Sequence, residues 1–351
     1  MQVNRSRISL VAILLFALLM APGTAYAAGN DLAFGTQASG TSWTRLAGET
    51  ALGTMMEVVD EGFQKGSCKT VVIATDNGYW DALTASGLAG KYKCPVLLTN
   101  PYVLSQETRY EIARLGATTA VVVGGPFAVG NAVVIEIQRM GLRVERAYGQ
   151  QAVDTALEIY KKGKTVGAWG KTAIVVTDNG YWDALSISPY SYVKNAPIFL
   201  ASVPVGGARK LNNASINAIR SGGFDRVYIC GGGLAVSSEV EKQLSGIRTT
   251  RLWGQTAIDT SQAIANQCVK EGMTPNKVCI ATDDGYWDGL TGAALSGKNN
   301  APLILATPGK TWTATNGFIT NNKGKISQAY ILGGPYVVPY ATETALRNAT
   351  K

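Results

Sequence analysis

Short runs of apolar residues without polar alternation recur along this chain, and this pattern predicts strands that are buried on both faces. In the middle of the sequence such runs occupy Thr172–Thr177, Pro197–Ala201 and Arg226–Cys230. Strands of a parallel sheet covered by helices on both sides have this composition. The segments between and around them with helical patterns are Thr155–Lys162, a helix opened by Asp183, Lys210–Ser221 and Ser237–Leu244. The alternation predicts βαβ units and an α/β fold with a parallel sheet.

The same pattern occurs three times. The string TDNGYWDAL at Thr75–Leu83 returns unchanged at Thr177–Leu185 and, as TDDGYWDGL, at Thr282–Leu290. A nine-letter match of this kind indicates duplication. Three further signals recur in the copies: an Arg-x-x-Gly, a proline that opens a strand and a double glycine that closes one. We therefore predict that each copy forms a small three-layer α/β domain. The repeats are residues 42–143, 144–247 and 248–351.

Three related copies can pack as a closed ring or as a linear chain. A domain of about 100 residues has only a marginal core of its own, and no Pro/Ser-rich linker separates the copies. A ring about a pseudo-threefold axis leaves no copy with an unpaired apolar face. We therefore expect a pseudo-threefold ring, with the linear chain as the alternative.

The start of the sequence has the pattern of an export signal. Arg5 and Arg7 form a positive start, Ile8–Met20 is an apolar run, and a small-x-small cleavage pattern ends at Ala27. The apolar run is too short for a comfortable membrane span, and no second run of that length follows. We expect the mature chain to be released outside the membrane, without stable membrane insertion. The expected segments are a signal peptide at residues 1–27 and a short lead at residues 28–41.

The excess of basic residues is modest. The sequence holds 32 basic and 24 acidic residues, a net charge of +8, and removal of Arg5 and Arg7 lowers it by two, to +6. The basic side chains are spread in small groups, so they are either scattered surface lysines or attract a polyanion. Outside a cell that polyanion would be a phosphate- or carboxylate-bearing wall polymer more than nucleic acid.

The sequence offers little support for metal, thiol or nucleotide chemistry. The five cysteines occupy different places in the repeats and there is no histidine, so we expect no shared metal site and no shared catalytic thiol. Neither a G-x-G-x-x-G nor a G-x-x-x-x-G-K-[ST] pattern is present, so no nucleotide cofactor is expected. Cys68 and Cys94 each precede a predicted strand of the first repeat, and an oxidising exterior allows a disulfide between them or leaves both free.

The repeated motif places charged and aromatic side chains where parallel sheets bind ligands. In each copy a strand ends at Thr-Asp, a tight Asn-Gly or Asp-Gly turn follows, and the last aspartate begins a helix. That aspartate can cap backbone N–H groups or belong to a polar site at the carboxyl ends of the strands. The Tyr-Trp pair before it can seal the contact between repeats or present flat faces to sugar rings. These residues are Tyr79, Trp80, Asp81, Tyr181, Trp182, Asp183, Tyr286, Trp287 and Asp288.

Asp76 and Asp81, with their equivalents, could suggest the two carboxylates of a glycosidase. A hydrolase rarely needs three copies of its site, however, and no shared nucleophilic serine or cysteine supports other hydrolytic chemistry. Repetition instead favours multivalent binding, in which weak sites gain avidity by acting together. We therefore name no catalytic residue.

These residues resemble a known family. The order of an Arg-x-x-Gly, a strand ending in a turn and Asp-Ala-Leu, a Pro-Ile/Val-Leu-Leu strand and an Ile-Leu-Gly-Gly strand is similar to the cell wall binding repeat type 2 of Gram-positive surface-layer and surface-anchored proteins. The resemblance covers about Ser42 to Lys351, and three tandem copies is the family's usual number. It implies three Rossmann-like repeats, packed as a pseudo-trimer, that hold the protein non-covalently to an anionic secondary wall polymer, teichoic-acid-like or a related polysaccharide.

The resemblance also implies candidate polymer-binding positions at one arginine and one aspartate of each copy. The arginine can bond bidentately to phosphate or pair with a carboxylate across a repeat junction. One departure is that the family's second arginine is replaced by Ala51, Ala152 and Ala257, so the polymer or the mode of holding it can differ. The carried-over positions are Arg45, Arg146 and Arg251, then Asp81, Asp183 and Asp288.

We therefore expect a secreted, non-enzymatic protein of the Gram-positive cell surface that binds an anionic wall polymer. The alternative is an extracellular wall-glycan enzyme or small-ligand receptor, which would need one repeat to differ in a cleft. Gly233, in place of Pro126 and Pro335, is a weak candidate for such a difference. Family proteins usually carry a further domain, whereas here only residues 28–41 lie between the signal and the repeats. A wall-binding module alone, a fragment and a subfamily with another ligand all remain open.

Overall fold

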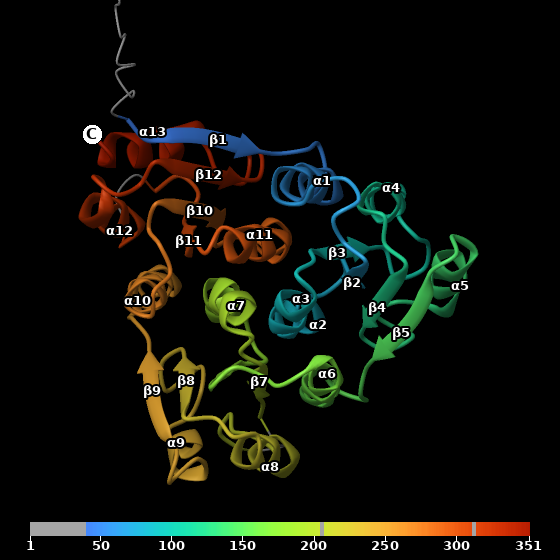
Figure 1. The fold of residues 1–351 in the computed structure, drawn as a ribbon. Helices are drawn as coiled ribbons and strands as arrows, with labels where there is room; N and C mark the ends of the chain where they lie inside the picture. Colours follow the sequence, from blue (N-terminus) through green and yellow to red (C-terminus); the bar gives the residue numbers. More distant parts are fainter. Residues whose placement is uncertain (1–39, 204–206, 311–313) are drawn as a thin grey trace, which may run out of the picture. The chain divides into compact units, whose positions relative to one another are not determined.

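A computed structural model describes residues 40–203, 207–310 and 314–351 of the chain. The predicted signal peptide and most of the predicted lead fall at residues 1–39, outside the described residues. Helices and strands alternate along the rest of the chain (Figure 1).

The elements follow the same order in each repeat, except that the first has two short helices, α2 and α3, where each of the others has one longer helix. In the first they are β1 (Ser42–Leu46), α1 (Ala51–Gly62), β2 (Thr70–Thr75), α2 (Trp80–Thr84), α3 (Ser86–Tyr92), β3 (Val96–Thr99), α4 (Gln106–Leu115), β4 (Thr119–Val123) and α5 (Asn131–Arg139). In the second they are β5 (Arg143–Ala147), α6 (Ala152–Val166), β6 (Thr172–Thr177), α7 (Trp182–Lys194), β7 (Ile198–Ala201), α8 (Asn213–Ser221), β8 (Arg226–Cys230) and α9 (Glu239–Gln243). In the third they are β9 (Arg248–Leu252), α10 (Ala257–Lys270), β10 (Lys277–Thr282), α11 (Trp287–Lys298), β11 (Leu303–Ala306), α12 (Ala314–Asn322), β12 (Gln328–Leu332) and α13 (Tyr340–Ala349).

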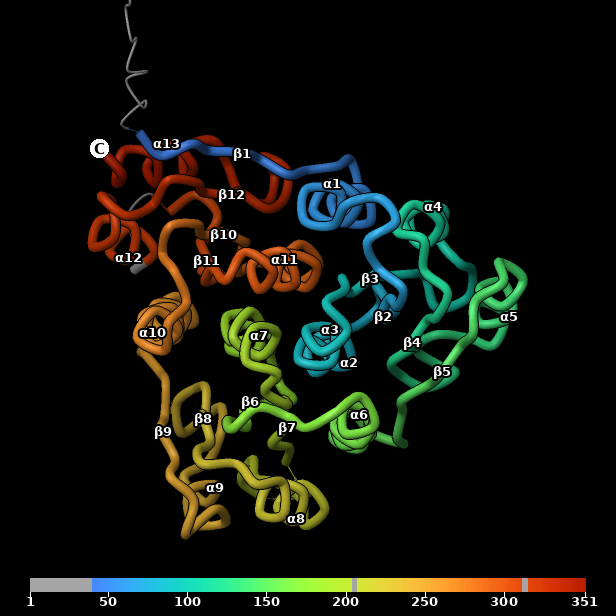
Figure 2. The backbone as a smooth tube through the Cα atoms, viewed as in Figure 1, coloured from blue at the N-terminus to red at the C-terminus, as the bar shows by residue number. Residues whose placement is uncertain are grey.

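The described strands form three sheets of four parallel strands, as the apolar runs predict. The strand orders are β3-β2-β4-β5, β7-β6-β8-β9 and β11-β10-β12-β1. In each order the outer strand β5, β9 or β1 opens the repeat that follows in a cyclic sense. The third sheet is therefore completed by β1 from the start of the chain, with Ser42 opposite Gln328 and Leu46 opposite Leu332. Figure 2 shows β1 running beside β12, so the ring predicted from the sequence is confirmed and closed by backbone pairing.

The apolar pattern of the sequence does not predict the strands β1, β5 and β9. Their sequences, SWTRL, RVERA and RTTRL, are rich in polar residues, and only the last residue of each is buried. An edge strand is covered less completely than a central one, so it does not need a continuous apolar run. The apolar runs mark the remaining strands because those are buried along nearly their whole length.

Local signals fix where the helices after these edge strands begin. Helix α10 starts with a capping box in which Thr256 and Asp259 exchange side-chain to backbone bonds. Gln151 and Asp154 form the equivalent box before α6. The helical pattern predicts a start at Thr155, three residues inside the observed start, because it takes no account of this box.

The repeats meet through helices at the centre of the ring. Figure 1 shows α3, α7 and α11 gathered inside the three sheets, and these helices contact one another. Small residues allow the close approach. A Cβ on Gly90 would lie 2.1 Å from the carbonyl oxygen of Tyr192, and one on Gly297 would lie 2.6 Å from the Tyr192 side chain. A side chain at either glycine would therefore force the central helices apart.

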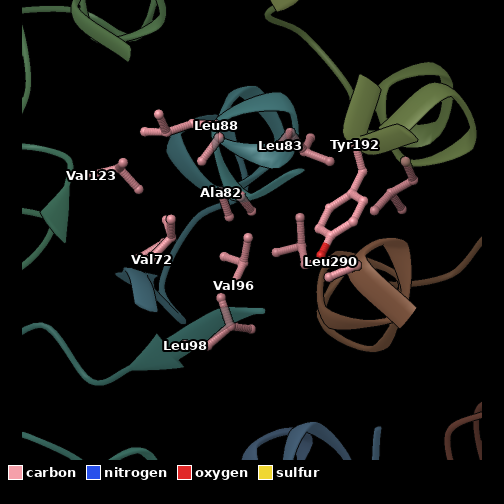
Figure 3. Close-up of a cluster of buried hydrophobic side chains, with 14 of the residues drawn as sticks. Val72, Ala82, Leu83, Leu88, Val96, Leu98, Val123, Tyr192 and Leu290 are labelled. Carbon is pink, nitrogen blue, oxygen red and sulfur yellow. The ribbon is translucent and has the colours of Figure 1, made fainter. Parts of the chain in front are cut away.

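One apolar core passes through the centre and joins the repeats. Leu83, Tyr192 and Leu290 come from the first, second and third repeats and belong to a single cluster of buried residues. Figure 3 shows these three side chains beside Val72 and Val96 of the first sheet. The repeats thus bury their remaining apolar faces on one another, which is the reason the sequence favours a ring.

Candidate functional site

The repeated motif forms a tight loop at the carboxyl end of the second strand of each sheet. Thr75, the last residue of β2, accepts a hydrogen bond from the backbone N–H of Asn77 at 3.0 Å, and the other two repeats make the same bond. Gly78 follows with a φ of 140°, a left-handed conformation that favours glycine. The helix then begins at the tryptophan. Because the three loops face the centre of the ring, their side chains meet there.

The three motif tyrosines pack against one another. The ring centroids of Tyr79, Tyr181 and Tyr286 lie 5.4 to 5.6 Å apart in edge-to-face geometry. Each hydroxyl also reaches the next repeat. Tyr79 accepts a hydrogen bond from the N–H of Gly180 at 3.1 Å, and Tyr181 accepts one from Gly285 at 3.0 Å. The third tyrosine returns to the first repeat, so the contacts form a closed circle.

The motif tryptophans bind the neighbouring repeat through their ring nitrogens. The indole N–H of Trp80 donates to the carbonyl of Asp178 at 2.6 Å, and Trp182 and Trp287 make the equivalent bonds at 2.7 and 2.8 Å. The three tryptophan residues nevertheless remain 37 to 40% exposed. The contact between repeats, one of the two interpretations of the Tyr-Trp pair, is therefore present. Contact of the exposed ring faces with a polymer stays a prediction.

The motif aspartates lie in the first helical turn, as predicted, but they do not act as N-cap residues. The helix starts one residue earlier, so the tyrosine occupies the N-cap position and makes no side-chain cap bond. Burial raises the pKa of Asp81, Asp183 and Asp288 to about 6, and hydrogen bonds from Thr155 to Asp81 and from Thr54 to Asp288 lower it in part. Both threonines belong to the following repeat.

These carboxyl groups explain the first glycine of the pair that follows the third apolar run of each repeat. A Cβ on Gly124 would lie 2.4 Å from a carboxylate oxygen of Asp81, and Gly231 and Gly333 stand in the same relation to Asp183 and Asp288. The three glycines also adopt φ values between 98° and 105°. The first glycine of each pair is therefore needed both for its conformation and for the space that it leaves to the aspartate.

The motif arginines hold the same turn from the edge strand. Arg146 donates to the carbonyls of Gly124 and Val129 at 2.7 and 2.8 Å, and burial lowers the pKa of its guanidinium. Arg251 bonds the carbonyls of Gly231 and Val236 and pairs with Glu241. Arg45 bonds the carbonyls of Gly333 and Val338 and pairs with Glu343, which joins the start of the chain to the third repeat. All three guanidinium groups are thus engaged within the protein.

A cleft of about 600 Å³ opens beside the turn of the first repeat, and the start of the second repeat forms its other side. Its lining includes the exposed ring of Trp80, the side chains of Phe127 and Tyr148, and the amide side chains of Asn77 and Gln150. Phe127 and Tyr148 are 99% and 48% exposed. The sequence pattern does not point to these two residues, because a single large side chain in a turn gives no periodic signal.

Comparison with known proteins agrees with the fold and the motifs. The family model Cell wall binding domain 2 (CWB2) matches residues 45–134, 146–241 and 251–343. This chain belongs to the CWB2 family. The resemblance stated from the sequence is therefore confirmed, and the three matches begin at the motif arginines of the three edge strands.

Two relatives of the CWB2 chain come from Bacillus subtilis (strain 168). N-acetylmuramoyl-L-alanine amidase LytC is 26% identical over 313 residues, which are 89% of this chain and 60% of LytC. The amidase enhancer is 29% identical over 237 residues, which are 67% of this chain and 31% of the enhancer. The chain therefore spans less than two thirds of the length of either relative.

Two solved structures share the fold of the three CWB2 repeats. Cwp6 from Clostridium difficile has a TM-score of 0.76 at 24% identity, over 89% of this chain and 48% of Cwp6. Cwp8 from the same organism has a TM-score of 0.77 at 25% identity, over 88% of this chain and 52% of Cwp8. The likeness supports the arrangement of three α/β repeats.

Two further features of the CWB2 repeats bear on the predictions. All five cysteines are buried and free, so Cys68 and Cys94 are not joined, and burial raises the pKa of the Cys94 thiol. Within the described ranges, no helix is long and apolar enough to cross a membrane.

Proposed function

We propose that this chain is a secreted, non-enzymatic protein that attaches non-covalently to an anionic secondary polymer of a Gram-positive cell wall, teichoic-acid-like or a related polysaccharide. The observation that carries the proposal is the repetition of one CWB2 motif three times around a ring. Three related sites on one ring can engage a repeating polymer together, and weak sites gain avidity in that way.

The twelve motif residues have different roles in this proposal. The exposed faces of Trp80, Trp182 and Trp287 are the parts that contact the polymer. The tyrosines keep the three loops together at the centre. The aspartates and arginines hold the double-glycine turns beside the tryptophans in place. An arginine could bind a phosphate only if its hydrogen bonds to backbone carbonyl groups were broken. The positive net charge attracts the polymer over a longer distance.

The names of the relatives are consistent with a place at the wall. One is named as an amidase and the other as an amidase enhancer, and this chain corresponds to part of each. The shared segment would then be the part that holds such proteins at the wall, while the activity of the whole amidase would not extend to this chain.

Sedimentation with purified cell walls tests the proposal. The protein should pellet with intact walls, stay in solution when phosphodiester polymers have been stripped with hydrofluoric acid, and be released as the salt concentration rises. Equal retention on intact and stripped walls would rule out the anionic polymer. Retention that does not change with salt would rule out the electrostatic contribution.

A second candidate function is a wall-glycan enzyme or small-ligand receptor. The observation that favours it is the cleft between the first and second repeats. Its lining includes Asp81, a carboxyl group with a pKa raised by burial to about 6. A carboxyl group that titrates near neutral pH can act as a general acid. Turnover of a wall glycan that is abolished by Asp81→Asn alone would favour this function, and the absence of turnover by the parent would exclude catalysis on that glycan.

A further inference from the structure

A large apolar side chain is exposed at the same place in every repeat. It follows the double glycine, and it is Phe127 in the first repeat, Leu234 in the second and Tyr336 in the third. These side chains are 99%, 94% and 99% exposed. Single exposed apolar residues are common, but nothing in the packing of the repeat accounts for the recurrence of one at this position.

In the first repeat this residue forms one wall of the cleft. Tyr148 follows the edge strand β5 and lies against Gly125, since a Cβ on that glycine would be 3.2 Å from its ring. Three exposed aromatic residues, Trp80, Phe127 and Tyr148, therefore line one hollow of about 600 Å³. Aromatic faces in a cleft with a few polar groups are suited to flat, partly apolar ligands such as sugar rings.

The charge of the residues that line the cleft limits the kind of ligand that the cleft can bind. Among the described residues that line the cleft there is no lysine or arginine, and Asp81 is the one charged group. A phosphate or carboxylate of the polymer would therefore meet no cation here. The amide side chains of Asn77, Gln150 and Gln151 can exchange hydrogen bonds with hydroxyl groups instead. The lining fits an uncharged sugar unit.

The three repeats are not equivalent at this site. Beside the turn of the second repeat, Trp253, which follows β9, occupies the position of Tyr148. A Cβ on Gly232 would lie 3.5 Å from its ring, so an aromatic ring covers this turn as well. Beside the turn of the third repeat this position is taken by Ala47, which follows β1, and a Cβ on Gly334 would meet nothing within 4 Å. The third repeat therefore lacks one of the aromatic walls.

We propose that Trp80, Phe127 and Tyr148 form a stacking subsite for an uncharged pyranose unit of the wall polymer. The proposal rests on the proposed function and assigns the sugar, and not the anionic group, to this cleft. Trp182, Leu234 and Trp253 occupy the corresponding positions at the next turn, with a leucine in place of one aromatic ring. The turn of the third repeat, which has Ala47 beside it, contributes less to binding, so the three turns of the ring bind the polymer with unequal strength.

Full-length variants with matched controls test the subsite. Phe127→Ala combined with Tyr148→Ala should weaken binding to Bacillus subtilis walls, measured by depletion in sedimentation, by about tenfold. Tyr336→Ala removes the corresponding residue of the third repeat and should change binding less than about twofold. Tyr110→Ala removes an aromatic residue that is 55% exposed on α4, away from the cleft, and should have no effect. The parent and the three variants should have the same melting temperature, because the altered side chains are exposed.

Competition separates the sugar from the charge. Neutral saccharide fragments, released from walls and freed of phosphate with hydrofluoric acid, should displace the parent protein from walls at millimolar concentration. The same fragments should displace the Phe127→Ala/Tyr148→Ala variant several-fold less effectively.

The outcomes distinguish the subsite from the proposed function. If the parent does not sediment with walls, the proposed function fails and the subsite fails with it. If the parent sediments and the double variant sediments equally well, the subsite is wrong and the wall-binding function stands. If the double substitution changes the oligomeric state in sedimentation velocity but leaves wall retention unchanged, these rings contact a second copy of the chain, and the subsite is again wrong.

Discussion

Asp183→Asn should make the stability of the protein less dependent on pH. Burial raises the pKa of Asp183 from 3.8 to about 6. The folded state thus binds this proton more tightly than the unfolded chain does. With more protons bound in the native state, the free energy of unfolding falls as the pH rises from about 3.8 to about 6. The asparagine variant ionises in neither state and should not show this fall.

The size of the effect follows from the two pKa values. The difference between 3.8 and about 6 corresponds to about 3 kcal/mol, at about 1.4 kcal/mol for each pH unit. At pH 4.5 the unfolded carboxyl is already largely ionised, so part of this loss has occurred. Between pH 4.5 and pH 7.5 about 2 kcal/mol remains to be lost.

Urea denaturation followed by tryptophan fluorescence at pH 4.5, 6.0 and 7.5 measures the effect. The free energy of unfolding of the variant minus that of the parent should rise by about 2 kcal/mol from the lowest to the highest pH. Other carboxyl groups titrate in both proteins and cancel in the difference. Glu57→Gln, which removes a carboxyl group at an exposed position of α1, is the matched control. A constant difference for Asp183→Asn would refute the argument from burial.

Three further predictions test the contacts that close the ring. Tyr79→Phe removes the hydroxyl that accepts from Gly180 and should cost about 1 kcal/mol in thermal denaturation; an unchanged melting temperature would contradict that bond. Arg146→Lys keeps the charge but loses the forked guanidinium that bonds two carbonyl groups. The substitution should lower the free energy of unfolding by about 1–2 kcal/mol, and salt should release the variant from walls at the same concentration as the parent. Release at lower salt with unchanged stability would instead indicate direct contact with the polymer. A chain that begins after Leu46 lacks β1 and exposes the edge of β12. Because an exposed strand edge pairs with other chains, this variant should elute earlier than the parent in size-exclusion chromatography at equal concentration. An unchanged monomeric elution would show that the edge is protected in another way.

Much of the fold could be predicted because burial leaves a clear pattern in the sequence. Runs such as Thr172–Thr177 are apolar throughout since both faces of the strand are covered. The edge strand RVERA at Arg143–Ala147 is only partly covered, so its composition resembles that of a loop. Its pairing with β4 in the sheet of the preceding repeat is a long-range property that no local pattern contains.

The candidate site could be predicted less completely than the fold. The recurrence of Trp80 and Asp81 points to the correct loop, because repetition is visible in the sequence. The bonds of Arg146 are not visible there, since its partners are backbone carbonyls and every residue has one. Phe127 could not be predicted for a different reason. The corresponding residues are leucine and tyrosine, so only the exposure of the side chain, and not its identity, is shared.

The pairing of β1 with β12 has a mechanical consequence for a protein held at a surface. The two strands are parallel, with five residue pairs in register from Ser42 and Gln328 to Leu46 and Leu332. A tension applied between residue 42 and the C-terminus would pull β1 from its first residue and β12 from its last. The strands would then be loaded in shear, so their hydrogen bonds would share the force rather than open one after another. We expect the ring to yield at high force in a single-molecule pulling experiment, and a first rupture at low force would mean that another junction gives way before this one.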